Sequence, residues 1–229
     1  MNNFIQSFEL NFIKDKRYMY LVEGLGNTLL ITFFAVILGV LLGFLIAVVR
    51  STHDKTGRMK FLNALCKLYL AVIRGTPAML QLLIWFYVIL VATPFPKVVV
   101  AMIAFGINSG AYVAEIVRSG IMSIDNGQFE AGRSLGFSYR QTMIYIILPQ
   151  AFKNVLPALA NEFIVLLKET SVCGYIGIMD LTRGSDIIRS RTYEAFLPLI
   201  AAGLIYLIIV MLLTGLVGRL ERRLRTSDR

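Results

Sequence analysis

The stretch Glu130–Pro149, EAGRSLGFSYRQTMIYIILP, is the polar segment around which the rest of the chain is organised. It occupies the one long gap between very apolar segments, and its residue types favour helix. Its first half carries Ala131, Gly132 and Gly136, small residues that let another protein surface come close. Its second half is apolar and ends in Pro149, which directs the chain back toward the next apolar segment. We interpret the stretch as the docking part of a longer loop, and a surface helix pair without a partner is the alternative.

The composition places the chain in a membrane. Of its 229 residues, 57% are hydrophobic and only 16% are charged, and the mean hydropathy is +0.70. A soluble domain carries roughly a quarter of charged residues. A spanning helix needs about 20 largely apolar residues, because the hydrocarbon core is about 30 Å thick. We therefore predict an all-α integral membrane protein with five transmembrane helices and one sizeable loop.

Several functional classes are disfavoured by what the sequence lacks. No basic run interleaved with aromatic residues accompanies the net charge of +9, so nucleic acid is not an expected partner. The single His53 has no Ser–His pairing and no metal-ligand cluster around it, so neither a catalytic centre nor a metal site is expected. The chain holds no Gly-Lys dipeptide and hence no phosphate-binding loop of the G-x-x-x-x-G-K-[ST] type. It is not expected to hydrolyse ATP or to carry a cofactor of its own.

The apolar and polar segments divide the chain into three parts. An amphipathic segment over residues 1–24 is expected to lie at the membrane interface. A transmembrane domain follows over 25–218, and a basic tail occupies 219–229. Within the domain we predict spans at 25–49, 61–91, 98–117, 151–172 and 196–217, a polar loop at 50–60, the docking loop at 118–153, and a connection with a short helix at 174–192.

Two features of the first two spans bear on packing. Gly39 and Gly43 form a G-x-x-x-G pattern that permits close helix approach, but glycine is common in membrane helices, and no interface is assigned from it. The second span is interrupted by Arg74-Gly75-Thr76-Pro77, where Pro77 removes a backbone donor and predicts a break. Such a break needs protein or a water-filled cavity around it. Two interpretations stay open: the run lines a translocation pathway or holds a gate, or it is a packing kink with Arg74 paired structurally.

Polar residues mark the third and fourth spans as internal. Asn108, Tyr112 and Glu115 share one face of the third span, and Asn161 and Glu162 belong to an unusually polar fourth span. Such side chains should face protein or a cavity rather than lipid. They either contact a transported molecule or form hydrogen bonds between helices.

The distribution of Lys and Arg predicts the orientation. The segments 50–60, 118–153 and 219–229 hold 13 of these residues, whereas the segments on the other side hold 7. The positive-inside rule then places the N-terminus outside, and the docking loop and the C-terminus in the cytoplasm.

The spacing within Glu130–Pro149 resembles the EAA loop of the membrane subunits of bacterial ABC importers, with Gly132 where that family usually has Ala. Residues 112–171, the YLVEGLGNTLLIT run from Tyr20 and the RGTP run from Arg74 are similar to the polar amino-acid subgroup, which includes histidine, glutamine and arginine permeases. The resemblance covers most of the chain. It implies a type I importer fold with cytoplasmic coupling helices, in a bacterial inner membrane.

The resemblance also implies a set of partners. A second permease chain, identical or related, would complete the pathway, and two ABC ATPase subunits would supply ATP hydrolysis with their own ATP and Mg²⁺. An extracytoplasmic binding protein would deliver an amino-acid substrate. Contact with the ATPase is expected at Glu130, Ala131, Gly132, Gly136, Leu148 and Pro149. The alternative is a stand-alone secondary transporter or channel.

An amino acid carries an ammonium group and a carboxylate, and a site on the pathway must provide a partner for each. Glu115 and Glu162 are the candidates for its ammonium group, and Thr76 with freed backbone donors is the candidate for its carboxylate. Asn108, Tyr112 and Asn161 would shape the rest of the site. The internal acidic residues could favour a basic amino acid.

Overall fold

The computed structural model describes residues 2–226, which are helical apart from short connections. The α-helices are α1 (Asn2–Phe8), α2 (Tyr18–Thr56), α3 (Lys60–Arg74), α4 (Ala78–Ile84), α5 (Lys97–Met122), α6 (Asn126–Ser134), α7 (Tyr139–Thr142), α8 (Leu148–Glu169), α9 (Leu181–Thr192) and α10 (Phe196–Thr226). Wider π-helical turns extend α4 over Trp85–Ile89 and join α7 to α8 over Met143–Ile147.

The five-span architecture is confirmed. Four helical runs within residues 2–226 are long and apolar enough to cross a membrane, namely Tyr18–Thr56, Lys97–Met122, Tyr139–Ile176 and Phe196–Leu224. The pair Lys60–Arg74 and Ala78–Ile89 makes a fifth when it is counted as one span, and it is bent by 105° at its break. The break falls at the predicted Gly75-Thr76-Pro77.

The helices extend beyond the predicted spans. Helix α2 continues through Arg50, where a loop was expected, and ends at Gly57 with a left-handed φ of 68°. Nothing between residues 50 and 56 is Gly or Pro, so the helix has no reason to end with its apolar stretch. Helix α10 likewise continues into the basic tail as far as Thr226, and the last three residues of that tail lie outside the described residues.

The segment before α2 is helical and only partly packed. Phe4, Ile5 and Phe8 are exposed, whereas Phe12 packs against α9. Asn11 donates to the Glu194 carboxylate at 2.5 Å and thereby fixes the segment beside the α9–α10 connection. The interfacial position of this segment stays a prediction, which its exposed apolar side motivates.

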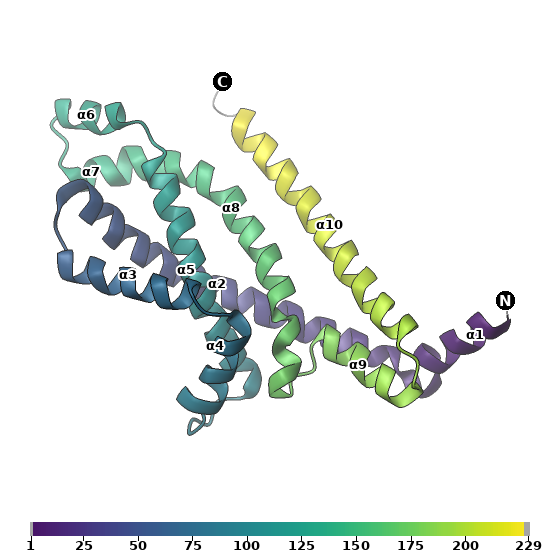
Figure 1. The fold of residues 1–229 in the computed structure, drawn as a ribbon. Helices are drawn as coiled ribbons and strands as arrows, with labels where there is room; N and C mark the ends of the chain where they lie inside the picture. The colour runs from purple at the N-terminus through teal and green to yellow at the C-terminus, as the bar shows by residue number, and fades with distance from the viewer. Residues whose placement is uncertain (1, 227–229) are drawn as a thin grey trace.

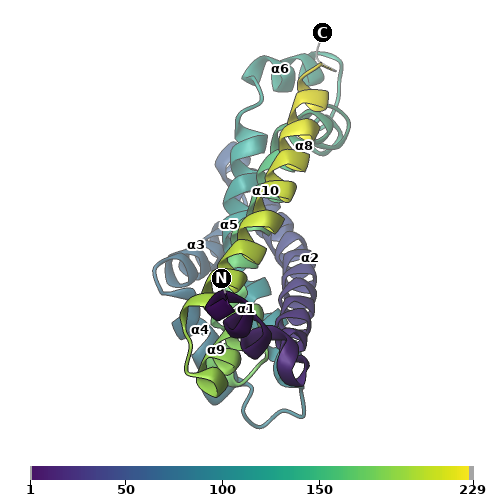
Figure 2. The same ribbon diagram turned by 90° about the vertical axis from the view of Figure 1, so that its right-hand side faces the viewer.

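The molecule has two distinct ends. Helix α6 and the end of α10 are at the same end of the molecule, although Figure 1 shows them apart, and α1 and α9 are at the other end (Figure 1 and Figure 2). The α2–α3 turn is at the same end as α6, because Lys55 bonds Asn126. This arrangement separates the predicted docking loop from the segment before α2.

Helices α2 and α5 pack more closely than any ordinary side chain would allow. A Cβ added at Gly39 would lie 2.8 Å from Ser109 Oγ, and one added at Gly43 would lie 2.6 Å from Val113 Cβ. The G-x-x-x-G pattern is therefore an interface within the chain, although we assigned none from sequence. The close approach brings the end of α2 beside the second half of α5.

One side-chain amide forms hydrogen bonds with the backbone carbonyls that the break between α3 and α4 leaves free. Gln81 Nε2 donates to the freed carbonyls of Ile73 at 2.7 Å and Thr76 at 3.0 Å, and also to Thr76 Oγ1 at 2.8 Å. Gln81 Oε1 in turn accepts from Asn108 on α5 at 2.9 Å. The protein itself thus meets the requirement that broken helices at membrane depth impose.

Asp180 organises the end opposite α6. Its carboxylate accepts from the backbone N–H of Arg183 at 2.8 Å, which caps α9, and from that of Gly174 at 2.5 Å. Burial raises the pKa of this carboxyl group, although these backbone donors oppose the shift.

Replacing Gln81 with Leu should destabilise the fold. The substitution keeps the size of the side chain but leaves the carbonyls of Ile73 and Thr76 and the amide of Asn108 without partners, at about 1–3 kcal/mol per buried group. We expect a lower thermal unfolding midpoint for the purified protein in detergent. The matched control is Gln6→Leu on the exposed face of α1. Equal midpoints for the two variants would show that Gln81 does not hold the break together.

Candidate functional site

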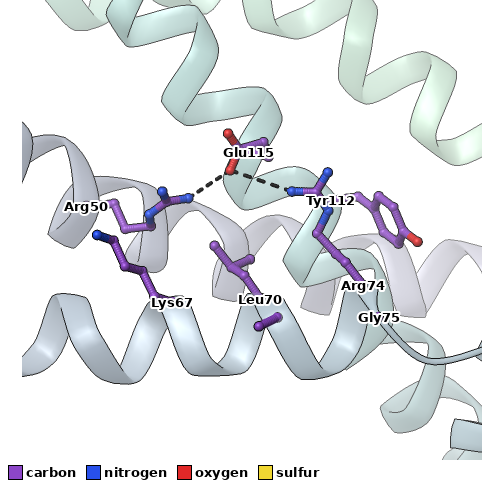
Figure 3. A pocket seen from close by; sticks show the side chains of 8 residues that line it. Arg50, Lys67, Leu70, Arg74, Gly75, Tyr112 and Glu115 are labelled. Atoms are coloured by element: carbon purple, nitrogen blue, oxygen red, sulfur yellow. Dashed lines mark hydrogen bonds and ion pairs between the residues drawn. The ribbon is translucent and has the colours of Figure 1, made fainter.

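A cavity of about 600 Å³ opens between α3, α5 and the end of α2. It is lined by Arg50, Lys67, Leu70, Ala71, Arg74, Gly75, Tyr112 and Glu115. Figure 3 shows the side chains of Arg50 and Arg74 reaching Glu115 from two sides. The cavity begins directly beside the helix break, because Arg74 and Gly75 belong to both.

Glu115 is the centre of a cluster of arginines. Its Oε2 accepts from Arg50 Nη1 at 2.8 Å, and its Oε1 accepts from Arg118 Nη2 at 2.6 Å. Arg74 Nη1 lies 3.9 Å from Oε2, which makes this the longest of the three ion pairs. Glu115 is therefore already neutralised within the chain, as a carboxylate on a spanning helix should be.

Arg74 is the most available cation of the cluster. Its side chain is 46% exposed, against 14% for Arg50 and 24% for Arg118. Its guanidinium lies 5.8 Å from the centroid of the Tyr112 ring, within cation–π range. Three cations and one carboxylate line the cavity, so its charge favours an anionic group of a ligand.

Sequence reasoning singled out Glu115, Tyr112 and Arg74 of this cavity but missed its other two cations, Arg50 and Lys67, and did not place Arg118 beside Glu115. Arg50 was placed in a loop because the apolar run stops there, and only the continuation of α2 brings it to Glu115. Lys67 lies inside the apolar run of α3, where an isolated cation is a signal of function that could have been followed. Arg118 was expected to begin the docking loop and is instead on the last turns of α5.

Asn108 and Thr76 lie at the break rather than on the cavity wall. The Asn108 amide donates to Gln81, and Thr76 Oγ1 donates to the Val72 carbonyl at 2.8 Å while accepting from Gln81. Both side chains thus support the backbone at the point where the cavity begins.

Asn161 and Glu162 are not brought to the cavity. Glu162 is 9% exposed and accepts from Ser109 Oγ at 2.9 Å, which joins α8 to α5. Asn161 lines a separate cleft of about 380 Å³ between the first half of α8 and the end of α10. Of the six sequence candidates, Glu115 and Tyr112 share one cavity.

The docking loop folds as two short helices, α6 and α7. Asp125 caps α6 by accepting from the Gly127 N–H at 2.6 Å. The helix ends in a Schellman motif, in which Phe137 N bonds Gly132 O at 3.0 Å and Gly136 N bonds Arg133 O at 2.9 Å. Gly136 has a φ of 80°, so the glycine of the motif is required by the backbone.

Gly132 stands where the EAA loop usually has alanine, and the structure gives a steric reason for the glycine. Gly132 is buried, and a Cβ there would lie 2.7 Å from both Cγ2 and Oγ1 of Thr142. The first helix of the loop therefore packs directly on the second. Alanine, which the EAA loop usually carries at this position, would not fit beside this threonine.

The remaining loop residues present an open surface. Glu130 and Ala131 are exposed on α6, and Leu135 is 72% exposed just after it. Leu148 and Pro149 lie where the π-helical turn Met143–Ile147 passes into α8, and Pro149 is exposed there. The loop thus combines capped, directly packed helices with an exposed apolar and charged face.

The chain belongs to the family of binding-protein-dependent transport system inner membrane components, whose model matches residues 35–226. It is 38% identical over 211 residues to the arginine transport system permease protein of Bacillus subtilis, covering 91% of this chain and 94% of that one. A chain from Rickettsia bellii, provisionally named as a glutamine transport system permease protein, is 37% identical over 222 residues and is covered completely, with 96% of this chain. Proteins of this family form the membrane part of ABC importers.

Solved structures confirm the type I importer fold. A chain from the crystal structure of an amino acid ABC transporter with histidines superposes with a TM-score of 0.83 at 42% identity, covering 93% of this chain and 98% of that one. A chain of a methionine ABC transporter in an inward-facing conformation superposes with a TM-score of 0.75 at 21% identity, with 90% and 96% covered, and supports the fold alone.

The contact between Gly132 and Thr142 predicts that a substitution at one position can be compensated by a substitution at the other. Gly132→Ala should force α6 away from α7 and weaken association with the ATPase partner. Thr142→Ala removes both atoms that lie 2.7 Å from the added Cβ, so the double variant should recover much of the loss. Copurification of the ATPase with each variant, quantified against the native chain, measures both effects. Equal copurification of the ATPase with Gly132→Ala and with the double variant would contradict the packing account.

Proposed function

We propose that this chain is the transmembrane subunit of an ATP-driven importer of a polar amino acid, and that it works by alternating access. The family membership, the five-span fold and the names of its relatives support this conclusion. The relatives are named for arginine, glutamine and cystine transport. These names support an amino acid as the substrate class, but they do not select one amino acid. A basic amino acid is one candidate because of the relative named for arginine, whereas the net positive charge of the cavity lining does not favour one.

The proposal includes the partners and the orientation. Two ATPase subunits carry ATP and Mg²⁺ and dock around Glu130, Ala131, Gly136, Leu148 and Pro149. Gly132, which the sequence also offered as a contact, is buried and acts from inside by letting α6 pack on α7. A second permease chain, identical or related, completes the pathway, and an extracytoplasmic binding protein delivers the substrate. The excess of Lys and Arg in the segments around α6 supports a cytoplasmic position for that end and an outside position for the N-terminus.

The cavity around Glu115 is the proposed substrate contact. Arg74 is exposed and holds Glu115 only at 3.9 Å, so its guanidinium can move to a substrate carboxylate. As Arg74 leaves, Glu115 becomes available to the substrate ammonium group, while Arg50 and Arg118 keep it in place. Asn108 and Thr76 position Arg74 through the break. Asn161 and Glu162 remain candidates for contacts elsewhere along the pathway, on the helix α8 that faces α5 and α10.

Two substitutions test the cavity. Arg74→Gln and Glu115→Gln should each reduce substrate uptake by about tenfold or more, equivalent to about 1.4 kcal/mol per factor of ten. The measurement is uptake into proteoliposomes that contain the whole transporter with its ATPase and binding protein, across a panel of amino acids. Assembly with the ATPase should be unchanged, because both residues lie away from α6 and α7.

Lys60→Gln is the matched control, since it removes an exposed cation at the start of α3, outside the cavity. Native uptake by both cavity variants would leave Glu115 and Arg74 as structural groups only. Uptake without any ATPase partner would contradict the proposed function itself and support a secondary transporter.

A further inference from the structure

Lys55 lies at the point where α2 meets the docking loop. It is on the last turn of α2, and its Nζ donates to Asn126 Oδ1 on α6 at 2.6 Å. The same ammonium lies 4.5 Å from the centroid of the Phe129 ring, one turn further along α6. Phe129 stacks on Tyr139 of α7 with centroids 6.5 Å apart. One cation of α2 therefore contacts the first docking helix directly and reaches the second through an aromatic pair.

The preceding residue, Asp54, pairs with an arginine that also holds Glu115 of the cavity. Asp54 Oδ2 lies 3.5 Å from Arg118 Nη1, and Arg118 also bonds Glu115 through Nη2 at 2.6 Å. Arg118 is thus shared between a carboxylate that lines the cavity and a carboxylate at the end of α2. Charged contacts continue from Arg74 through Glu115 and Arg118 to Asp54, and Lys55 begins the contacts to α6.

We propose that Asp54 and Lys55 are positioning residues that join the substrate cavity to the docking helices, so that cavity occupancy and the position of α6 influence each other. The inference rests on the proposed function, since it assigns the regulation of that same cavity. It adds a connection through the end of α2, a segment outside the docking loop itself.

The physical basis is competition for Arg118. When a substrate takes part of the charge of Glu115, Arg118 is held less firmly on the cavity side and binds Asp54 more closely. Asp54 and Lys55 are adjacent on one helical turn, so a shift at one moves the other against Asn126 and Phe129. The opposite path is equally available, because coupling between two sites is reciprocal. Movement of α6 by the ATPase would then change how Glu115 is held.

The test compares coupled with basal ATP hydrolysis in the complete reconstituted transporter. Lys55→Met keeps most of the side-chain length and removes the charge, whereas Lys55→Arg keeps the donor and the cation–π contact. We expect Lys55→Met to lower the stimulation of ATPase activity by loaded binding protein about fivefold or more, with basal hydrolysis retained. Lys55→Arg should keep the stimulation, and Asp54→Asn should lower it.

A double-variant cycle shows whether the residues act together. Asn126→Ala should lower the stimulation, and adding it to Lys55→Met should produce less than the product of the two separate losses. Lys60→Gln is the control on the neighbouring helix. Full stimulation in Lys55→Met and Asp54→Asn would overturn the inference while leaving the proposed function intact. An equal fall of basal and stimulated activity would also overturn it, because that pattern indicates only a folding defect. A native transporter without stimulation by any loaded binding protein would contradict the proposed function instead.

Discussion

The contact between α2 and α5 is the constraint on which the rest of the structure depends. Because Gly39 and Gly43 have no side chains, the α2 backbone lies directly against Ser109 and Val113 of α5. This approach brings Arg50, beyond the apolar part of α2, within 2.8 Å of Glu115. The same contact places Asp54 beside Arg118. A larger residue at either glycine would separate the helices and break the ion pairs of Arg50 with Glu115 and of Asp54 with Arg118.

The cavity and the helix break form a single unit. Gln81 satisfies the carbonyls that the break sets free, and its own carbonyl oxygen is held by Asn108 of α5. The break can therefore persist at membrane depth, and Arg74 emerges from it toward Glu115 and Tyr112. Arg74 is thus both paired with Glu115 and exposed to a cavity, and its place on a translocation pathway is part of the proposed function. A polar site inside an apolar bundle is stable here because each cation near Glu115 shares that carboxylate or remains partly in solvent.

Much of this could be predicted from sequence, and the failures have clear physical causes. Long apolar runs and Pro77 predict five spans and the break, since both depend on local chemistry. The helical character of Glu130–Pro149 was also predicted, its docking role stays a proposal, and the structure explains Gly132 by its contact with Thr142. The residues that line the cavity were harder to predict, because side chains on one helical face can contact different neighbouring helices. Asn108 and Glu115 share a face of α5, yet one meets Gln81 and the other meets Arg50. Pairings between distant helices leave no signal in a single sequence.

The central claim is that a separate ATPase subunit drives this chain through α6. The most direct measurement is cross-linking from a single cysteine at Ala131, an exposed position on α6, after replacement of the two native cysteines, Cys66 and Cys173. In membranes that contain the whole transporter, the account predicts a cross-link to the ATPase subunit and protection of this cysteine from an impermeant thiol reagent added outside. Labelling from outside, or cross-linking to no ATPase under any nucleotide condition, would contradict the account.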